Sequence, residues 1–179
     1  DSPVAYPTDD LAVMPNPEFL HVSWKGRTIK TQLTGAYNFP NVAAAIALGL
    51  HFEVPESDIV SAIEGYVPEN QRSQLIKKNG HTLIMDAYNA NPTSMRAAIT
   101  NFATANLPNK MLWIGGMKEM GPEELNEHRE LVTFISNYEW KEVILVGKEF
   151  NGLQGCYTWF DNSGEAAEYV KMHQPAGSS

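Results

Sequence analysis

The chain has 179 residues, which is enough for one ordinary domain or for a small domain with part of another. Its formal net charge of -8 argues against a nucleic-acid backbone or an anionic membrane as partner. The lone Cys156 excludes an internal disulfide framework, and neither a signal peptide nor an apolar run near the roughly 20 residues of a membrane span is visible. These features together predict a cytoplasmic protein.

The first part of the chain predicts a hairpin followed by two helices. Apolar and polar side chains alternate on both sides of Lys25-Gly26, which is typical of a hairpin turn between strands. Pro55 precedes the second helix, and Ser57 or Asp58 is expected to cap it. The predicted elements are a loop or an irregular edge at 1–17, strands at 19–24 and 27–33, and helices at 38–52 and 55–66.

After a linker at 66–71, strands and helices alternate, which predicts a parallel sheet with right-handed crossovers. Asn79-Gly80 predicts a hairpin, and Cys156 is expected in a buried strand. We therefore expect an α/β fold in which residues 70–179 form a Rossmann-like, mostly parallel sheet with flanking helices. The predicted elements are strands at 72–78, 81–87, 110–115, 143–146 and 157–160, and helices at 92–105, 123–138 and 163–173.

Polar side chains gather where ligands meet such a sheet, at the carboxyl ends of the strands. Asp86 ends a predicted strand, and Asn89 and Asn91 lie in the turn before a helix. A carboxylate at a strand end can hold a ribose hydroxyl, and a helix start favours anions. Ordinary turn chemistry is the alternative, because Asn and Pro populate turns for local reasons.

Two further groups carry a functional and a structural interpretation each. Asn38 and Asn41 share a helix face, and an Asn amide offers the donor and the acceptor that an adenine edge requires; alternatively, Asn38 only caps the helix. Arg72 can reach a phosphate with two parallel hydrogen bonds; alternatively, it is a solvated surface charge.

A glycine-rich segment, residues 115–121, contains Lys118 and Glu119, which suit charge or proton roles beside a ligand that the glycines let approach. His128 lies in the next predicted helix, where a lone histidine is usually structural or solvated. Gly147-Lys148-Glu149 lacks the hydroxyl and the upstream glycine of a P-loop, and no His/Cys cluster has zinc spacing, so no metal site is predicted in the chain.

These segments, in this order, resemble the Mur ligase family, and its MurF branch in particular. Asp-Ala-Tyr-Asn-Ala-Asn-Pro-Thr-Ser-Met at 86–95 is the most specific match. Gly-Gly-Met-Lys-Glu-Met-Gly at 115–121 with Glu-His-Arg at 127–129, and Leu-Thr-Gly-Ala-Tyr-Asn-Phe-Pro-Asn at 33–41, are similar to two further motifs of the family. The resemblance covers most of residues 18–150.

The resemblance implies an ATP-dependent amide ligase that acts through an acyl phosphate and needs Mg²⁺. Residues 1–68 would be the end of a central ATPase domain and residues 70–179 a C-terminal domain cut short at its end. The P-loop and the magnesium ligands would lie upstream, so the chain alone is expected to be inactive. The implied partners are ATP, UDP-N-acetylmuramoyl-tripeptide and D-Ala-D-Ala, without nucleic acid or membrane, and a monomer is expected.

The resemblance also implies a role for each candidate residue. Arg72, which would reach the γ-phosphate, and Lys118 would be catalytic. The other assignments are adenine for Asn38 and Asn41, ribose for Asp86, the space beside ATP and the incoming dipeptide for Tyr88, Asn89 and Asn91, and substrate binding for Glu119 and His128.

The sequence departs from the family pattern at Tyr37, where a His is usual, at Gly116, where an Asp is usual, and at the tail 175–179, which replaces an expected Lys-Gly-Ser-Arg stretch. Two alternatives stay open: a related ligase of the MurE or folylpolyglutamate type with another acceptor, or a non-catalytic Rossmann-like binding module.

Overall fold

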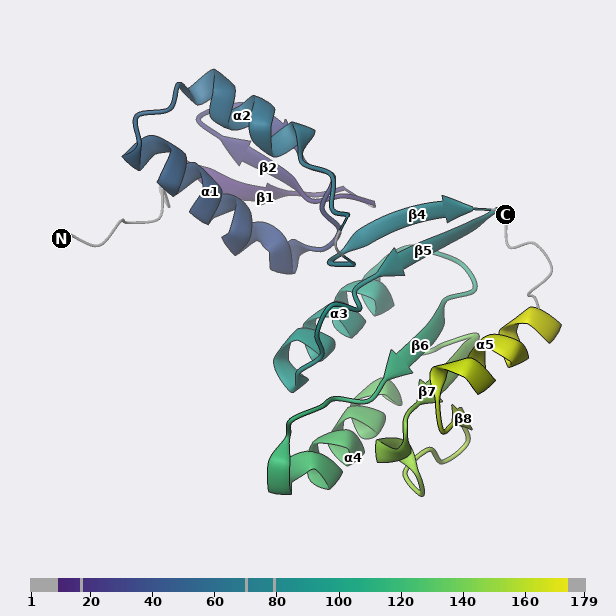
Figure 1. Ribbon diagram of the computed structural model, residues 1–179. Coiled ribbons are helices and arrows are strands. Elements are labelled where there is room, and N and C mark those ends of the chain that lie inside the picture. The colour runs from purple at the N-terminus through teal and green to yellow at the C-terminus, as the bar shows by residue number, and fades with distance from the viewer. Residues whose placement is uncertain (1–9, 17, 70, 79, 174–179) are drawn as a thin grey trace. The chain divides into compact units, whose positions relative to one another are not determined.

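The computed structural model forms two compact units, each with its own hydrophobic core (Figure 1). It describes residues 10–16, 18–69, 71–78 and 80–173. The first unit contains residues 1–76 and 82–88, and the second contains residues 77–81 and 89–179. The predicted domain division, 1–68 and 70–179, concerns a longer protein and stays a prediction.

The first unit contains an antiparallel sheet in the order β1-β2-β3. Its strands are β1 (Leu11–Met14), β2 (His21–Trp24) and β3 (Arg27–Lys30). The predicted turn is confirmed, since Lys25 and Gly26 both have positive φ, 49° and 74°, as a tight hairpin turn requires. Of the two interpretations of residues 1–17, the edge applies to Leu11–Met14, because these residues pair with β2 as an outer strand of the sheet. Residues 1–9 and 17 lie outside the described ranges.

Two helices, α1 (Phe39–His51) and α2 (Glu56–Gly65), pack against this sheet (Figure 1). The helices meet closely at Gly49, where an added Cβ would lie 2.7 Å from the Ile59 side chain. The expected cap of α2 is wrong: the helix follows Pro55 and has no side-chain cap, and Ser57 and Asp58 lie inside it. The core of the unit is formed by Leu20, Val22, Trp24, Ile29, Val42, Ile46 and Ile59.

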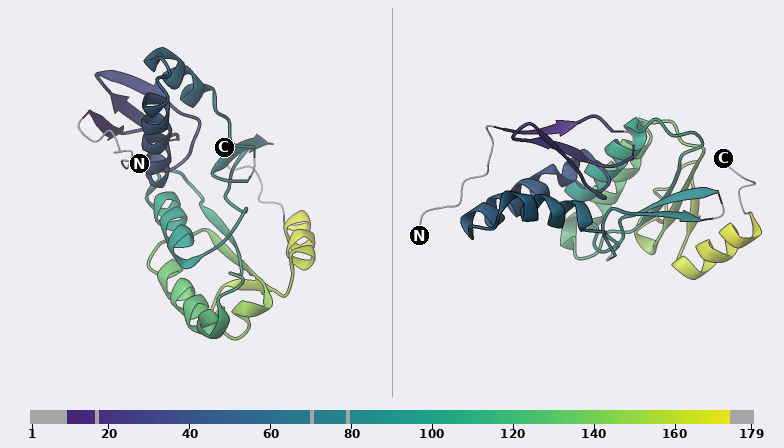
Figure 2. Two further views of the ribbon diagram at one scale, coloured as in Figure 1. Left: turned by 60° about the vertical axis from the view of Figure 1, so that its left-hand side comes forward. Right: turned by 90° about the horizontal axis from the view of Figure 1, so that it is seen from above.

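The second unit contains the predicted parallel sheet, in the order β6-β7-β8, which confirms the α/β class. Helices α3 and α4 lie on one face of the sheet and α5 on the other, as Figure 2 shows by their teal, green and yellow ribbons. Along β7, Val143 and Leu145 face α3 and α4, whereas Ile144 and Val146 face α5. The elements are α3 (Pro92–Thr104), β6 (Met111–Gly115), α4 (Glu124–Ile135), β7 (Glu142–Val146), β8 (Thr158–Phe160) and α5 (Ser163–Met172).

The strands β4 (Gln74–Lys78) and β5 (His81–Met85) pair as a separate two-stranded sheet. The predicted Asn79-Gly80 turn falls partly outside the described residues, because Asn79 is not among them. The expectation for Cys156 is wrong: it is exposed and lies in the turn before β8. None of the helices in the described ranges has the length and apolar character that a membrane crossing needs.

Candidate functional site

The guanidinium of Arg72 lies over the ring of Tyr88, 4.0 Å from its centroid. Arg72 precedes β4 and Tyr88 follows β5, so the paired strands bring the two side chains together. Among the described residues no carboxylate lies within ion-pair distance of Arg72. The aromatic face therefore orients the cation without neutralising it, which leaves its charge for an anionic ligand.

The backbone on both sides of Arg72 adopts the left-handed conformation. Gln71 has φ 58° and Ser73 has φ 52°, a region that non-glycine residues rarely occupy. The Ser73 side chain is buried and hydrogen-bonded, which holds this conformation in place. Such conformations cost energy and persist only where the surrounding structure maintains them. They gather at active sites and ligand-binding positions.

Asp86 follows β5 and belongs to a small hydrogen-bond network. Its carboxylate accepts hydrogen bonds from the Tyr37 hydroxyl, with 3.3 Å between the oxygens, and from the Ser73 backbone N–H, at 3.4 Å. The Tyr37 and Ser73 hydroxyl oxygens lie 2.8 Å apart. Burial raises the pKa of the Tyr37 hydroxyl above its ordinary value of 10.0, and the charge of Asp86 raises it further, although the bond with Ser73 lowers it. Tyr37 therefore stays neutral and can donate to Asp86. The side chain of Asp86 remains exposed.

Asn38 occupies the N-cap position of α1, but its side chain makes no capping hydrogen bond, so the capping interpretation is wrong. Its amide nitrogen donates to the Thr34 carbonyl at 2.8 Å and to Ser73 Oγ at 2.9 Å, and its oxygen accepts from Asn41 Nδ2 at 3.0 Å. Asn38 is 7% exposed, whereas Asn41 is exposed. Asn41 is thus the member of the pair whose remaining polar groups are available to a ligand.

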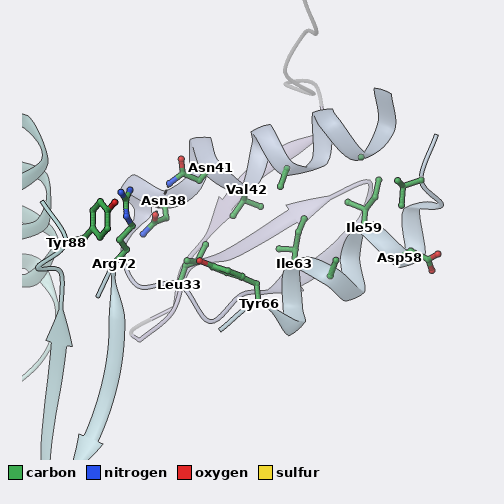
Figure 3. Close-up of a pocket in the computed structure, with 14 residues that line it drawn as sticks. Leu33, Asn38, Asn41, Val42, Asp58, Ile59, Ile63, Tyr66, Arg72 and Tyr88 are labelled. Atoms are coloured by element: carbon green, nitrogen blue, oxygen red, sulfur yellow. Dashed lines mark hydrogen bonds between the residues drawn. The ribbon is translucent and has the colours of Figure 1, made fainter. Parts of the chain in front are cut away.

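These side chains border a cavity of about 800 Å³ in the first unit (Figure 3). In Figure 3, Arg72, Asn38 and Asn41 lie at the end of the cavity beside Tyr88, and mostly apolar side chains line the rest, with Asp58 at the opposite end. Its size falls in the range of small-molecule sites. The lining is formed by Leu33, Asn38, Asn41, Val42, Ala45, Gly49, Val54, Asp58, Ile59, Ala62, Ile63, Tyr66, Arg72 and Tyr88.

In the second unit, Lys118 pairs with the carboxylate of Glu149. Lys118 is 74% exposed and Glu149 is 11% exposed. Burial alone raises the pKa of the Glu149 carboxyl, but the hydrogen bond from Lys118, the Glu149 backbone N–H and the charge of Lys118 outweigh it. The pKa therefore lies below its ordinary value of 4.5. The neighbouring Glu119 is exposed, with φ 62°.

His128 is fully buried in α4, and both ring nitrogens are hydrogen-bonded. Nε2 accepts the Met117 backbone N–H at 2.9 Å, and Nδ1 donates to the Glu124 carbonyl at 2.6 Å. The ring also meets Phe150 edge-on, with 5.0 Å between centroids. His128 thus anchors the loop that carries Lys118. Both of its ring nitrogens are already hydrogen-bonded in this geometry, and its predicted direct contact with substrate stays a prediction.

Asn89 and Asn91 engage their own backbone. Asn91 caps α3, accepting the Ser94 N–H at 2.9 Å, and Ser94 Oγ accepts the Asn91 N–H in return. Asn89 accepts the Ala90 N–H at 2.9 Å. The turn interpretation therefore accounts for both side-chain oxygens, and a role in ligand binding would fall to their exposed amide nitrogens. Residue-level roles remain predictions for both.

Three residues of the site were not predicted from sequence: Ser73, Tyr37 and Glu149. Ser73 and Tyr37 join Asn38 to Asp86, and Glu149 joins the loop after β7 to Lys118. Glu149 had a usable signal, since it follows a predicted strand by three residues, at the edge where ligands are expected. The structure brings Asn38, Asn41, Arg72, Asp86 and Tyr88 together in the first unit.

The Lys118–Glu149 pair should make stability depend on pH. A carboxyl whose pKa is lowered by folding stabilises the protein above its unfolded pKa, and this contribution is lost as pH falls through the folded pKa. We expect the difference in Tm between the wild type and Glu149→Gln to be constant above about pH 5 and to shrink at more acidic pH. Thermal unfolding of both proteins from neutral to acidic pH measures this, and a difference that grows toward acid would contradict the assignment.

The comparisons with known proteins agree on one family. Residues 71–175 match the family described as Mur ligase, glutamate ligase domain. A curated protein of Bacillus subtilis (strain 168), named UDP-N-acetylmuramoyl-tripeptide--D-alanyl-D-alanine ligase, is 36% identical over 135 residues, which cover 73% of this chain and 30% of that protein. The chain thus spans about a third of the length of this relative.

Solved structures give the same result for the fold. A MurF structure from Acinetobacter baumannii superposes with a TM-score of 0.73 at 26% identity, covering 93% of this chain and 39% of that one. A MurF ligase from Thermotoga maritima, solved in complex with ADP, superposes with a TM-score of 0.67 at 16% identity, covering 93% and 38%. At that lower identity the second likeness concerns the fold alone.

Proposed function

Because this chain belongs to the Mur ligase family and its relatives are MurF proteins, we propose that it is part of an ATP-dependent ligase that joins D-Ala-D-Ala to UDP-N-acetylmuramoyl-tripeptide. The substrates are taken from the name of the Bacillus subtilis relative. The MurF relatives, rather than the fold, separate this proposal from a ligase with another acceptor, because folylpolyglutamate synthase structures share the fold at 15% identity.

The observation that carries the proposal is Arg72, which has no carboxylate within ion-pair distance among the described residues and lies at the end of a cavity that also presents Asn41. A nucleoside triphosphate combines a flat base, a ribose and a strongly anionic tail, and each matches a group in the first unit. Asn41 would meet the adenine edge, with Asn38 holding Asn41 in place. Exposed Asp86, fixed by Tyr37, would accept hydrogen bonds from the ribose hydroxyls.

An amine cannot displace the oxygen of a free carboxylate, because that oxygen is a poor leaving group. We infer that the tripeptide carboxylate first takes the γ-phosphoryl group of ATP, giving an acyl phosphate and ADP, and that the dipeptide amine then displaces phosphate. Arg72 would stabilise negative charge on the transferring phosphoryl group, and Lys118 would act beside the acceptor. Residue Tyr88 would keep Arg72 aimed at the phosphate.

Magnesium is implied by the family. Within the described ranges, no group of three or more His, Cys, Asp or Glu side chains is arranged to hold a metal ion. No step is therefore assigned to magnesium on these residues, and the expectation that its ligands lie upstream stays a prediction. So do the expected inactivity of the chain alone, the cytoplasmic location and the monomeric state.

Phosphate release by the full-length gene product tests the proposal. The assay contains ATP, magnesium, UDP-N-acetylmuramoyl-tripeptide and D-Ala-D-Ala, and each is omitted in turn. We expect sustained release only when all are present. Release with another amine acceptor but none with D-Ala-D-Ala would move the protein to a different ligase of the family, and no release with any acceptor would favour a binding module.

The variant Asp86→Ala tests the ribose assignment in the same assay. A hydrogen bond to a charged group contributes about 1.5–3 kcal/mol, so we expect KM for ATP to rise roughly 10- to 100-fold, with a smaller change in kcat. Asp161→Ala, which removes an exposed carboxylate after β8, is the matched control and should leave KM unchanged. An unchanged KM for ATP in Asp86→Ala would refute this role.

A further inference from the structure

Two glycines leave the space that the Glu149 side chain occupies. Gly116 follows β6 and Gly147 follows β7, at the carboxyl ends of neighbouring parallel strands. A Cβ added to Gly116 would lie 2.6 Å from Glu149 Oε2 and 2.9 Å from its Cδ, and a Cβ on Gly147 would meet the same oxygen. Real Cβ atoms essentially never come within 3.0 Å of another atom in this way. The Glu149 carboxylate therefore lies where a side chain at position 116 would project.

Position 116 is also where this sequence departs from the motif that it resembles, which carries an aspartate there. The backbone of Gly116 does not require glycine, because its φ lies outside the left-handed region, so a side chain there would require only that the Glu149 carboxylate, the end of a flexible side chain, move away. We propose that Glu149 supplies, from the loop after β7, the carboxylate that the motif carries at position 116, and that it acts as a positioning residue for Lys118. This inference rests on the proposed function.

The two ends of the ion pair differ in exposure, which gives them different tasks. Glu149 is 11% exposed and Lys118 is 74% exposed, so a nearly buried anion holds an exposed cation. A free lysine side chain has large rotamer freedom, and a fixed partner removes much of it before a ligand arrives. Glu149 Oε1 accepts the hydrogen bond from Lys118, whereas Oε2 is buried and makes no hydrogen bond within the described residues. Lys118 is therefore the side chain that the carboxylate orients.

The backbone of the loop is fixed separately. The Met117 N–H is held by the buried ring of His128, and the Gly116 N–H donates to the Val146 carbonyl at 2.9 Å. What Glu149 adds is therefore the direction of the Lys118 side chain. Because ligands meet parallel sheets at the carboxyl ends of the strands, the oriented ammonium is placed to contact an anionic group of a substrate.

Steady-state kinetics of the full-length enzyme test the proposal by moving the carboxylate. We expect Glu149→Gln and Glu149→Ala to lower kcat/KM for at least one substrate about tenfold or more, as expected for the loss of one charge-assisted contact. Gly116→Asp combined with Glu149→Ala should restore kcat/KM to within a few-fold of the wild type, whereas the matched control Gly116→Asn with Glu149→Ala should not. Equal activity of these two double variants would overturn the proposal.

A second cycle separates positioning from general structural support. If Glu149 acts through Lys118, then Glu149→Gln should lower kcat/KM little further in a protein that already carries Lys118→Met. Full and independent losses from the two substitutions would show that Glu149 does not act through Lys118. If the wild-type enzyme did not ligate D-Ala-D-Ala, that result would count against the proposed function. Both sets of variants would then be assayed with the amine acceptor that the enzyme does use.

Thermal unfolding tests the shared space without any activity assay. We expect Gly116→Asp to lower Tm in the wild-type background, because two carboxylates would collide and repel each other there, and to lower it much less when Glu149 is alanine. The same loss of Tm in both backgrounds would show that the side chain at 116 does not meet Glu149, which overturns the inference even in a protein that ligates D-Ala-D-Ala.

Discussion

Replacing Arg72 by alanine is expected to lower kcat roughly 100- to 1,000-fold, the loss typical of removing a group that stabilises developing charge in a transition state. Thermal stability should change little, since Arg72 is exposed and its guanidinium lies over the face of Tyr88. Arg72→Lys keeps the charge but loses the planar fork, so we expect it to lie between wild type and alanine.

The control for Arg72 is Arg27→Ala, because Arg27 is an exposed arginine of β3 in the same unit. Phosphate release at saturating substrates measures kcat, and dipeptide and tripeptide omissions confirm that ligation is being followed. If Arg72→Ala changed only KM for ATP and left kcat intact, Arg72 would bind ground-state phosphate without stabilising the transition state.

The largest stability effect is expected at His128. His128→Ala would open a cavity beside Phe150 and leave the buried Met117 N–H without an acceptor, so we expect a loss of about 3 kcal/mol in the free energy of unfolding. His128→Gln retains an acceptor of similar reach and should lose less. Denaturant unfolding of the full-length protein measures both.

Exposed His51, at the end of α1, provides the comparison, and His51→Ala should change stability by less than about 0.5 kcal/mol. A His128→Ala protein as stable as the wild type would show that the ring does not anchor the Met117 loop. A protein that loses activity while retaining full stability would instead favour the direct substrate contact predicted from sequence.

Much of the fold could be predicted because its signals are local. Lys25-Gly26 predicts its own turn, and the apolar segment of β7 predicts a strand buried on both faces. For Leu11–Met14 the sequence left a loop and an irregular edge open, because this strand has little pattern of its own and is defined by pairing with β2. Cys156 was misplaced for a related reason, since β8 is three residues long and begins only after it.

The site was less predictable, because several of its contacts join residues that are distant in sequence, such as Asn38 and Ser73. The sequence shows that Asn38 starts a helix, but its amide is engaged by Thr34, Ser73 and Asn41 rather than by the helix backbone. Likewise, the sequence shows only that position 116 lacks the aspartate of the motif, and the fold is needed to show that the Glu149 carboxylate lies against Gly116. The local sequence pattern predicts neither the contact of Asn38 with Ser73 nor that of Gly116 with Glu149.

The register of the parallel sheet has a consequence for how the chain folds. Met111 pairs with Glu142, a separation of 31 residues, so β6 and β7 cannot meet until the whole crossover through α4 has been closed into a loop. In the other unit, β2 and β3 meet across a two-residue turn. We therefore expect the β2–β3 hairpin to form on a microsecond timescale and the parallel sheet to follow. During synthesis, the backbone edges of β6 and β7 would then stay unpaired longer than those of β2 and β3.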